Sequence, residues 1–281
     1  MVACATGPYT GRMAASQLAF IGGGNMAGAI FGGLVRSGWP AAAIRVVEPW
    51  AERRERIAAA HPGVHVLAVA DASLAVADIV VWAVKPQSFA DAAAACAPHV
   101  GRALQLSVMA GIRSQALVSA SGSQRVVRAM PNTPALIGQG IAGLYAREAV
   151  VAADRAAVEA VLAPTGQLLW FEREEQLDAV TALSGSGPAY VFYFIEAMIE
   201  AGTQLGLAPD QARRLAEQTF VGAASLAMQS GEPVQLLRDR VTSKGGTTQA
   251  AIESLEVDRV RAAIVRALHA AQARAVELGR A

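Results

Sequence analysis

Three glycines stand between an apolar, strand-like run and a helix-compatible run near the start of the chain. Within Leu18–Ala27, Gly22, Gly24 and Ala27 occupy the small-residue positions of a G-x-G-x-x-G/A fingerprint. The first glycine permits a tight turn, the second lets the backbone approach a pyrophosphate, and the third small residue lets the helix pack closely on the strand. The start of the helix then offers free N–H groups to phosphates. A plain tight turn is the alternative, but the strand-to-helix context favours nucleotide binding.

A serine-rich turn, Ser184–Pro188, is a candidate for nucleophilic chemistry. No histidine stands where it could act as the base, and the spacing differs from that of a nucleophile elbow. We therefore interpret the segment as a tight entry into a helix, with Pro188 in its first turn.

The histidines and cysteines show no metal or disulfide pattern. His61 and His65 form a close pair, but no cysteine or cluster of carboxylates accompanies them, so we interpret both as surface loop residues. Cys4 and Cys96 lie far apart in the sequence and are typical of free thiols in a reducing compartment. We expect no metal site.

The composition narrows the class of partner. Hydrophobic residues make up 53% of 281 residues, which allows a sizeable core in one or two domains. The net charge is +1 without a basic run, which argues against nucleic acid or an anionic membrane as the main partner. The longest apolar stretch, Pro188–Ile199, is too short and too charged to span a bilayer. We expect a cytoplasmic protein.

Short apolar runs alternate with helix-compatible runs in the first part of the chain. The expected strands are Leu18–Ile21, Ile44–Val47, Val64–Val69, Asp78–Val84, Leu104–Val108 and Val126–Ala129. The expected helices include Met26–Ser37, Gln87–Ala97, Ser114–Ser119 and Asp154–Leu162. This alternation predicts βαβ units in a doubly wound, mostly parallel sheet, that is, an α/β Rossmann-like fold.

Charged residues follow two of these strands, where ligands bind in doubly wound sheets. Glu48 ends the second strand and precedes Pro49, and an acid there favours the free 2′-hydroxyl of an adenosine ribose. Arg53 and Arg54 could instead meet a 2′-phosphate, or simply lie in a solvated helical turn. Lys85 follows the fourth strand and is either a ligand-binding residue or a solvent-facing lysine before a proline turn.

The second part of the chain is expected to be all-helical. The expected helices are Ala189–Gly206, Pro209–Ser230, Pro233–Arg240, Gln249–Leu255 and Asp258–Glu277. The first is apolar nearly all the way round, so we expect a second subunit to complete its burial. The predicted domains are a disordered extension (1–17), a dinucleotide-binding Rossmann domain (18–172) and an all-helical dimerisation and substrate domain (173–281).

Five motifs occur in one order along the chain: Phe20–Ala27, Ala83–Gln87, Val126–Pro134, Asp178–Ala189 and Val241–Thr248. Together they make the chain closely resemble pyrroline-5-carboxylate reductase from about residue 18 to the C-terminus. The last two motifs are the more specific, because generic dinucleotide folds lack them. The resemblance implies reduction of 1-pyrroline-5-carboxylate to L-proline, the last step of proline biosynthesis, with NAD(P)H as hydride donor. It also implies a homodimer with interlocked C-terminal helices, sometimes assembled further into rings of dimers.

The resemblance further implies how the coenzyme is held. The glycine loop would hold the pyrophosphate, Glu48 and Pro49 would lie near the adenosine, and Val84, Lys85 and Ala110 would line the nicotinamide side. The implied coenzyme-binding residues are Ile21, Gly22, Gly23, Gly24, Asn25, Met26, Ala27, Glu48, Pro49, Ala83, Val84, Lys85, Pro86, Ala110 and Gly111. NADP(H) is expected over NAD(H).

The family's substrate loop matches Ser243–Thr248. Backbone N–H groups of Gly245, Gly246 and Thr247, at a helix start, would form an anion site for the substrate carboxylate. The Thr248 hydroxyl would meet the ring nitrogen and favour the protonated, more electrophilic imine, so Thr248 is the expected catalytic residue. Without the resemblance, Thr247 would be interpreted as a helix N-cap. The implied substrate-binding residues are Ser243, Gly245, Gly246, Thr247, Thr248 and Glu174.

Three positions depart from the family pattern. Ala70 stands where many members carry an asparagine that helps hold the coenzyme, and Glu48 stands where a more neutral residue is frequent. Both weaken the implied preference for NADP. Lys244 stands where proline or asparagine is common, and its charge could aid binding of the substrate carboxylate.

Two other functions stay open on the sequence. A related dehydrogenase, such as a hydroxy-acid or F420-linked enzyme, would share the N-terminal domain but need a different substrate loop. A non-catalytic nucleotide sensor or scaffold would keep the glycine loop but has no need of Thr248.

Overall fold

The computed structural model describes residues 16–280, so the predictions on residues 1–15 and on Cys4 lie outside the described residues. Two compact units make up the rest: residues 16–186 together with 271–280, and residues 187–270. The change of unit falls at Ser186 and Gly187, later than the change in sequence character near Phe171. The predicted domain boundary after residue 172 stays a prediction. Gln17, which we assigned to the extension, is instead bonded to the sheet unit, since its N–H donates to Asp78 Oδ2 at 2.8 Å.

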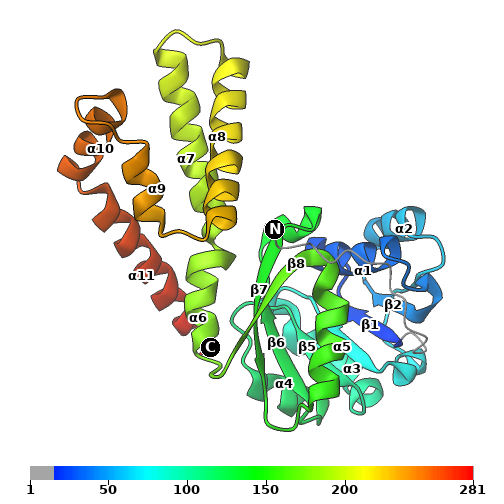
Figure 1. Ribbon diagram of the computed structural model, residues 1–281. Coiled ribbons are helices and arrows are strands. Elements are labelled where there is room, and N and C mark those ends of the chain that lie inside the picture. The colour runs from blue at the N-terminus through cyan, green and yellow to red at the C-terminus, as the bar shows by residue number, and fades with distance from the viewer. Residues whose placement is uncertain (1–15, 281) are drawn as a thin grey trace. The chain divides into compact units, whose positions relative to one another are not determined.

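An eight-stranded sheet organises the first unit (Figure 1). Its strands are β1 (Leu18–Ile21), β2 (Ile44–Val47), β3 (His65–Leu67), β4 (Ile79–Trp82), β5 (Leu104–Ser107), β6 (Val126–Met130), β7 (Gly140–Ala146) and β8 (Gly166–Phe171). Their spatial order is β3-β2-β1-β4-β5-β6-β7-β8. Strands β1 to β6 are parallel and follow the order of a dinucleotide-binding fold, which confirms the predicted fold class.

The two strands at one edge, β7 and β8, were not predicted. β7 runs antiparallel to β6, and β8 runs parallel to β7. Glycines interrupt the apolar pattern here because neighbouring atoms leave no room for a side chain. A Cβ on Gly140 would lie 2.8 Å from the Ala135 nitrogen, and one on Gly143 would lie 2.9 Å from the Val180 side chain.

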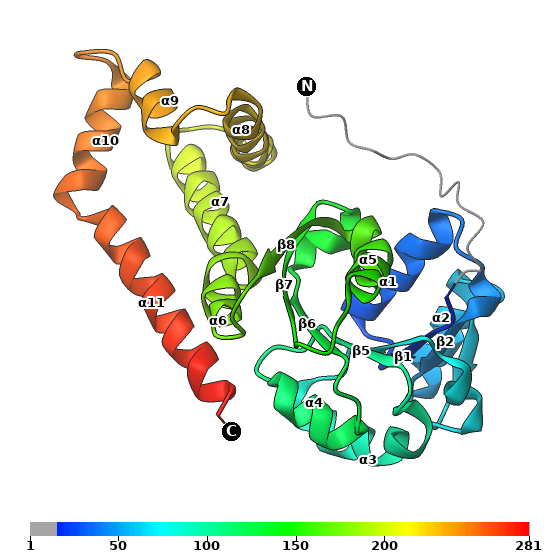
Figure 2. The ribbon, with the colours of Figure 1, turned by 60° about the horizontal axis from the view of Figure 1, so that its bottom comes forward.

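Helices cover both faces of the sheet. One face carries α1 (Asn25–Arg36), α2 (Ala51–Ala60) and α5 (Ala152–Leu162), and the other carries α3 (Phe89–Val100) and α4 (Ser114–Ser121) (Figure 2). Alternate residues of β1 enter the two cores: Leu18 and Phe20 pack on the α1 side, and Ala19 and Ile21 on the α3 side. Strands covered on both faces are apolar without alternation, which is why the sequence located them well.

Of the two histidines singled out in the sequence, His61 lies in the loop after α2, as predicted, whereas His65 lies in a strand. His61 is the C-cap residue that follows α2, and it packs edge-on against Phe31, with ring centroids 5.1 Å apart. Burial lowers the pKa of His61, and the neighbouring Arg36 charge adds to that effect. His65 begins β3 and is exposed.

A helix leads out of the sheet unit. α6 (Gln176–Val180) continues as a π-helical turn over Thr181–Gly185, and α7 (Gly187–Gln204) follows. The predicted helix entry at Ser184–Pro188 does contain the start of α7, but α6 and the π-helical turn precede it, so the segment joins two helices. Pro188 does lie in the first turn of α7, as predicted. The Ser184 hydroxyl donates to the Val180 carbonyl at 3.1 Å.

The second unit is all-helical, as predicted. It contains α7, α8 (Pro209–Ser230), α9 (Val234–Arg240), α10 (Thr247–Val257) and the first part of α11 (Val260–Leu278). α7 and α8 run antiparallel, joined by a short turn (Figure 1). They approach closely where Gly202 meets Ala212, because a Cβ at Gly202 would lie 3.0 Å from that of Ala212. Within the described range, no helix combines the length and apolarity needed to cross a membrane.

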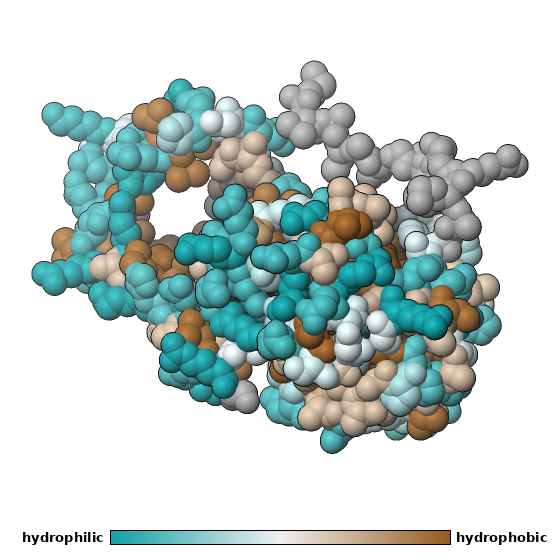
Figure 3. Space-filling view, turned by 90° about the horizontal axis from the view of Figure 1, so that it is seen from below, coloured by the Kyte–Doolittle hydropathy of each residue, from teal (hydrophilic) through white to brown (hydrophobic). Residues whose placement is uncertain are grey.

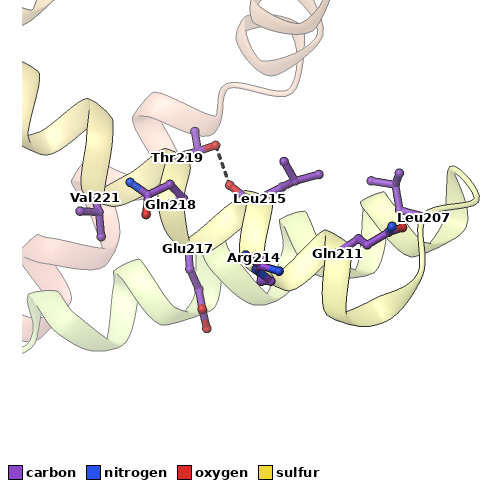
Figure 4. A pocket seen from close by; sticks show the side chains of 8 residues that line it. All are labelled: Leu207, Gln211, Arg214, Leu215, Glu217, Gln218, Thr219 and Val221. Carbon is purple, nitrogen blue, oxygen red and sulfur yellow. Dashed lines mark hydrogen bonds between the residues drawn. The ribbon is translucent and has the colours of Figure 1, made fainter.

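These helices expose an unusual amount of apolar surface. Phe192 is 58% exposed, Tyr193 72% and Met228 72%, and Figure 3 shows apolar residues at the surface of the helical unit. A cavity of about 960 Å³ lies along α8 (Figure 4). It is lined by Leu207, Gln211, Arg214, Leu215, Glu217, Gln218, Thr219 and Val221, none of which is a predicted site residue. Exposed aromatic and apolar side chains that lie close together are typical of contact surfaces.

Candidate active site

The glycine loop after β1 is locked to the two neighbouring strands. The Gly22 N–H donates to the Val47 carbonyl of β2, and the Ala83 N–H after β4 donates to the Ile21 carbonyl, both at 2.9 Å. Gly22 has φ +97°, and a Cβ there would lie 2.8 Å from the Ala83 carbonyl oxygen. Only glycine therefore fits this position. The ends of β1, β2 and β4 thus meet at one point, at the carboxyl edge of the sheet.

The N-terminus of α1 is open toward solvent. Gly24 is the N-cap residue, and among residues 16–280 no side chain caps this end. A Cβ at Gly24 would meet nothing within 4 Å among the described atoms. The free N–H groups of the first turn and the helix dipole favour an anion. This geometry fits the pyrophosphate of a dinucleotide.

Glu48 does not point where the sequence suggests. Its side chain is only 3% exposed, and three donors of the chain occupy its carboxylate. Oε2 accepts from the Gly23 N–H at 3.0 Å and from Arg53 Nη1 at 3.2 Å, while Oε1 accepts from the Trp50 N–H at 3.1 Å. Arg54 donates to the carbonyls of Glu48 and Pro49. The acid is therefore part of the framework under the glycine loop.

Two further loops leave the same edge of the sheet. Val84 is partly buried against the α3-side core, whereas Lys85 is exposed and precedes a short turn over Pro86–Ser88. The loop after β5 carries Ala110 and Gly111, which are half-buried. A Cβ at Gly111 would lie 3.2 Å from that of Leu278, so the end of α11 packs on this loop. This contact was not predicted from the sequence.

Glu174 lies in a buried network of charges. Its carboxylate accepts from the Ser114 N–H and hydroxyl, each at 2.7 Å, and from Arg128 Nη1 at 2.8 Å. Beside this cluster, Arg113 and Asp178 form an ion pair of 2.7 Å. Burial alone would raise the pKa of Glu174, but the bonds from Ser114 and Arg128 together hold it below its usual value.

Sequence reasoning missed the arginines of this network. Arg128 sits in β6 with its side chain only 5% exposed, and burial lowers its pKa against the opposing effect of Glu174. Its Nε and Arg113 Nη1 have no hydrogen-bond partner among the described residues. A charge inside an apolar strand is the sequence signal that could have revealed it, because such a charge needs a partner.

The predicted substrate loop lies in the helical unit and precedes α10. Gly246 is the N-cap of α10, so Thr247 and Thr248 are its first two residues and the N-cap interpretation of Thr247 is wrong. The loop closes on itself, since the Gly246 N–H donates to the Ser243 carbonyl at 3.0 Å. A Cβ at Gly246 would lie 2.6 Å from Ser243 Oγ. Thr248 is half-buried.

Two of the three predicted anion donors are already bonded within the loop. Gly245 N–H donates to Gln249 Oε1 at 2.6 Å, and Gly246 N–H is held by Ser243. The open donors at this helix end are therefore those of Thr247 and Thr248, because Gly246, as the N-cap residue, adds no side chain to cap them among the described residues. The coenzyme residues and Glu174 belong to the sheet unit, and this loop belongs to the helical unit. Within residues 16–280, no group of three or more potential metal ligands occurs.

Known proteins resemble the chain over nearly its full length. A relative from Pseudomonas aeruginosa, named pyrroline-5-carboxylate reductase, is 45% identical over 95% of this chain and 98% of its own. The chain belongs to the pyrroline-5-carboxylate reductase family. A second member of the family, from Pisum sativum, is 38% identical over 93% of this chain and 95% of its own. The family model for pyrroline-5-carboxylate reductase dimerisation matches residues 174–278, and one for F420-dependent NADP oxidoreductases matches residues 17–111.

Solved structures of the family agree. The reductase from Coxiella burnetii matches with a TM-score of 0.86 and 37% identity, covering 94% of this chain and 99% of that one. The reductase from Plasmodium falciparum, solved with NADP bound, matches with a TM-score of 0.83 and 29% identity over 94% of this chain and 98% of its own. The F420-type match stops before α4, so it supports the nucleotide-binding half alone.

Proposed function

We propose that this chain reduces 1-pyrroline-5-carboxylate to L-proline with NAD(P)H, as the last step of proline biosynthesis. The observation that carries the proposal is the 45% identity to a reductase of that name over 98% of its length. In this proposal the dinucleotide-binding domain, 18–172, binds the coenzyme. The dimerisation domain, 173–281, provides the substrate loop and the subunit contacts.

A bound nicotinamide coenzyme would supply the hydride. The open end of α1 and the glycine loop, Ile21–Ala27, would hold its pyrophosphate, since Gly24 leaves room for the phosphates. Glu48 and Pro49 would lie at the adenosine end. The loops after β4 and β5, which carry Ala83–Pro86 and Ala110–Gly111, would line the nicotinamide side.

The substrate is a small ring with a carboxylate and a C=N bond. The N-terminus of α10 would bind the carboxylate, through the N–H groups of Thr247 and Thr248 and, when Gln249 turns away, of Gly245. The Thr248 hydroxyl would hold the ring nitrogen in its protonated form. The C=N carbon then accepts the hydride, its π electrons move to nitrogen, and a neutral ring amine results. Glu174 would stabilise the site beside the substrate.

We further propose a preference for NADP(H) over NAD(H). The Glu48 carboxylate is occupied by donors of the chain, so it is not free to accept from a ribose hydroxyl. Arg53 and Arg54 surround the same turn and would favour a 2′-phosphate.

The helical unit would form a homodimer in the cytoplasm. The match of residues 174–278 to a dimerisation model supports this, as do the exposed aromatic residues of α7. A partner subunit covering these helices would remove their apolar surface from water.

Turnover of 1-pyrroline-5-carboxylate tests the proposal. The purified protein is mixed with the substrate and either NADPH or NADH, and coenzyme oxidation is followed by absorbance. Proline formation with a higher kcat/KM for NADPH is the expected result. A folded, dimeric protein that binds NADPH but turns over no cyclic imine would contradict the proposal and favour a nucleotide sensor.

A further inference from the structure

A cationic cavity lies beside the glycine loop. Its volume is about 330 Å³, and it lies between α1 and α2. Its lining includes Gly23, Gly24 and Asn25 of the loop. It also includes Arg36, Arg53, Arg56 and His61, and none of the lining residues within the described range is acidic. Such a lining favours a phosphate group next to the dinucleotide site.

Arg53 is the arginine of this lining that is fixed in place. Its Nη1 is bound to Glu48, and its guanidinium stacks over the Trp50 ring at 5.0 Å from the centroid. The side chain is still 41% exposed, which leaves room for a second partner. A guanidinium held on one edge and open on the other is suited to bind a phosphate.

Glu48 connects this arginine to the glycine loop. One oxygen, Oε2, accepts from both the Gly23 N–H and Arg53. A Cβ at Gly23 would lie 2.5 Å from Ile57 Cδ1 and 3.3 Å from this oxygen, so the loop approaches the carboxylate as closely as a glycine allows. Turning Glu48 outward to meet a ribose would leave a buried N–H without a partner and release Arg53.

We propose that Glu48 is a positioning residue for coenzyme selection, which fixes Arg53 beside the glycine loop so that the arginine binds the 2′-phosphate of NADPH. An acid at the end of β2, which in many dinucleotide folds accepts from a free ribose diol, here selects the opposite coenzyme. The inference rests on the proposed use of NADP(H), and it adds that Glu48 positions the arginine that binds the 2′-phosphate.

Equilibrium binding of NADPH and NADH tests this without requiring turnover. Arg53→Ala leaves the Glu48–Gly23 bond intact and should weaken NADPH binding about tenfold or more, while NADH binding changes less than about twofold. Glu48→Gln places an amide NH₂ against at least one of its three donors, and should weaken NADPH binding by a similar factor. Arg53→Lys should recover part of the loss.

Glu55→Gln is the matched control, because Glu55 lies on the same helix as Arg53, is exposed and lies outside the lining of the cavity. It should leave both affinities unchanged. Thermal unfolding of each variant shows whether it is folded. If Glu48→Gln is not folded, Glu48→Asp replaces it, because aspartate keeps the charge but is too short to reach both Gly23 and Arg53, and it should weaken NADPH binding more than NADH binding. A wild-type protein that prefers NADPH, with the same NADPH-to-NADH ratio in Arg53→Ala, would overturn the inference. A wild-type protein that binds both coenzymes equally and still makes proline would overturn it and leave the proposed reaction standing.

Discussion

The Arg128 guanidinium donates from Nη1 to Glu174 Oε1 at 2.8 Å, and both side chains are largely buried. Glu174 follows β8, Arg128 lies in β6, and Ser114, which also donates to the Glu174 carboxylate, begins α4. The same carboxylate thus holds three segments together. The family resemblance places Glu174 near the substrate, but in this chain Glu174 also stabilises the fold. A substrate-binding role and a stabilising role predict different results on substitution.

Replacing Glu174 with Gln should destabilise the sheet unit by about 1–3 kcal/mol, because Arg128 would keep a buried charge without its anion. Urea denaturation measures this change. Glu172→Gln, two residues away and exposed, is the control and should change stability by less than about 0.5 kcal/mol. A variant of normal stability with a raised KM for the substrate would show that Glu174 serves binding alone.

The same pair predicts how stability depends on pH. The folded-state pKa of Glu174 is depressed, so its contribution is fully present above the unfolded-state value of about 4.5 and is lost as pH falls through the lower folded-state value. Wild type should therefore lose more stability on acidification below about pH 4.5 than Glu174→Gln does. Identical slopes of unfolding free energy against pH would contradict this.

Alanine substitutions at Gly22 and Gly24 should have different effects, the first on stability and the second on coenzyme affinity. Gly22→Ala should cost about 1–3 kcal/mol of stability, since φ is +97° and the Ala83 carbonyl blocks a Cβ. Gly24→Ala has an ordinary φ of −71° and open space, so the protein should fold with less than about 1 kcal/mol change. It should nevertheless bind NADPH at least about tenfold more weakly, because its methyl group occupies the path of the pyrophosphate. Unchanged coenzyme affinity in folded Gly24→Ala would place the phosphates elsewhere.

The central strands were predictable because burial on both faces leaves a continuous apolar run. Leu18–Ile21 and Ile44–Val47 were located to the residue. β7 and β8 were not predicted because Gly140 and Gly143 break the pattern. These glycines are needed because of contacts with residues distant in the sequence, Thr165 and Val180. Local sequence carries no information on such a contact.

The direction of side chains in the candidate site was harder to predict than their position. Glu48 stands at the expected end of β2, but its carboxylate is turned inward by the N–H groups of Gly23 and Trp50. Gln249 likewise reaches back over one helical turn to occupy Gly245. A sequence motif predicts which residues lie in one loop. Which N–H groups bind a given carboxylate depends on the folded geometry, so the direction of the Glu48 side chain could not be predicted.

The exposed aromatic residues of α7 predict a subunit contact. Tyr193→Glu and Phe192→Glu should shift the protein from dimer toward monomer, because burying a carboxylate in an apolar contact is costly. Sedimentation velocity over a range of concentrations measures the shift. Val151→Glu is the control, since it changes a 59% exposed apolar residue of the sheet unit and should leave the dimer intact. Dimers of normal affinity in both α7 variants would place the contact on other helices.

Thr248 and Thr247 are adjacent residues at the start of α10, and they should respond differently to the same substitution. If the Thr248 hydroxyl holds the proton on the ring nitrogen, Thr248→Ala should lower kcat by about 10²-fold, and Thr248→Ser should restore much of it. If the hydroxyl only orients the ring, Thr248→Ala should mainly raise KM. Thr247→Ala should have little effect, because its proposed contribution is a backbone N–H that alanine keeps. Steady-state kinetics with NADPH give both parameters, and a Thr248→Ala enzyme with wild-type kcat and KM would remove the hydroxyl from the mechanism.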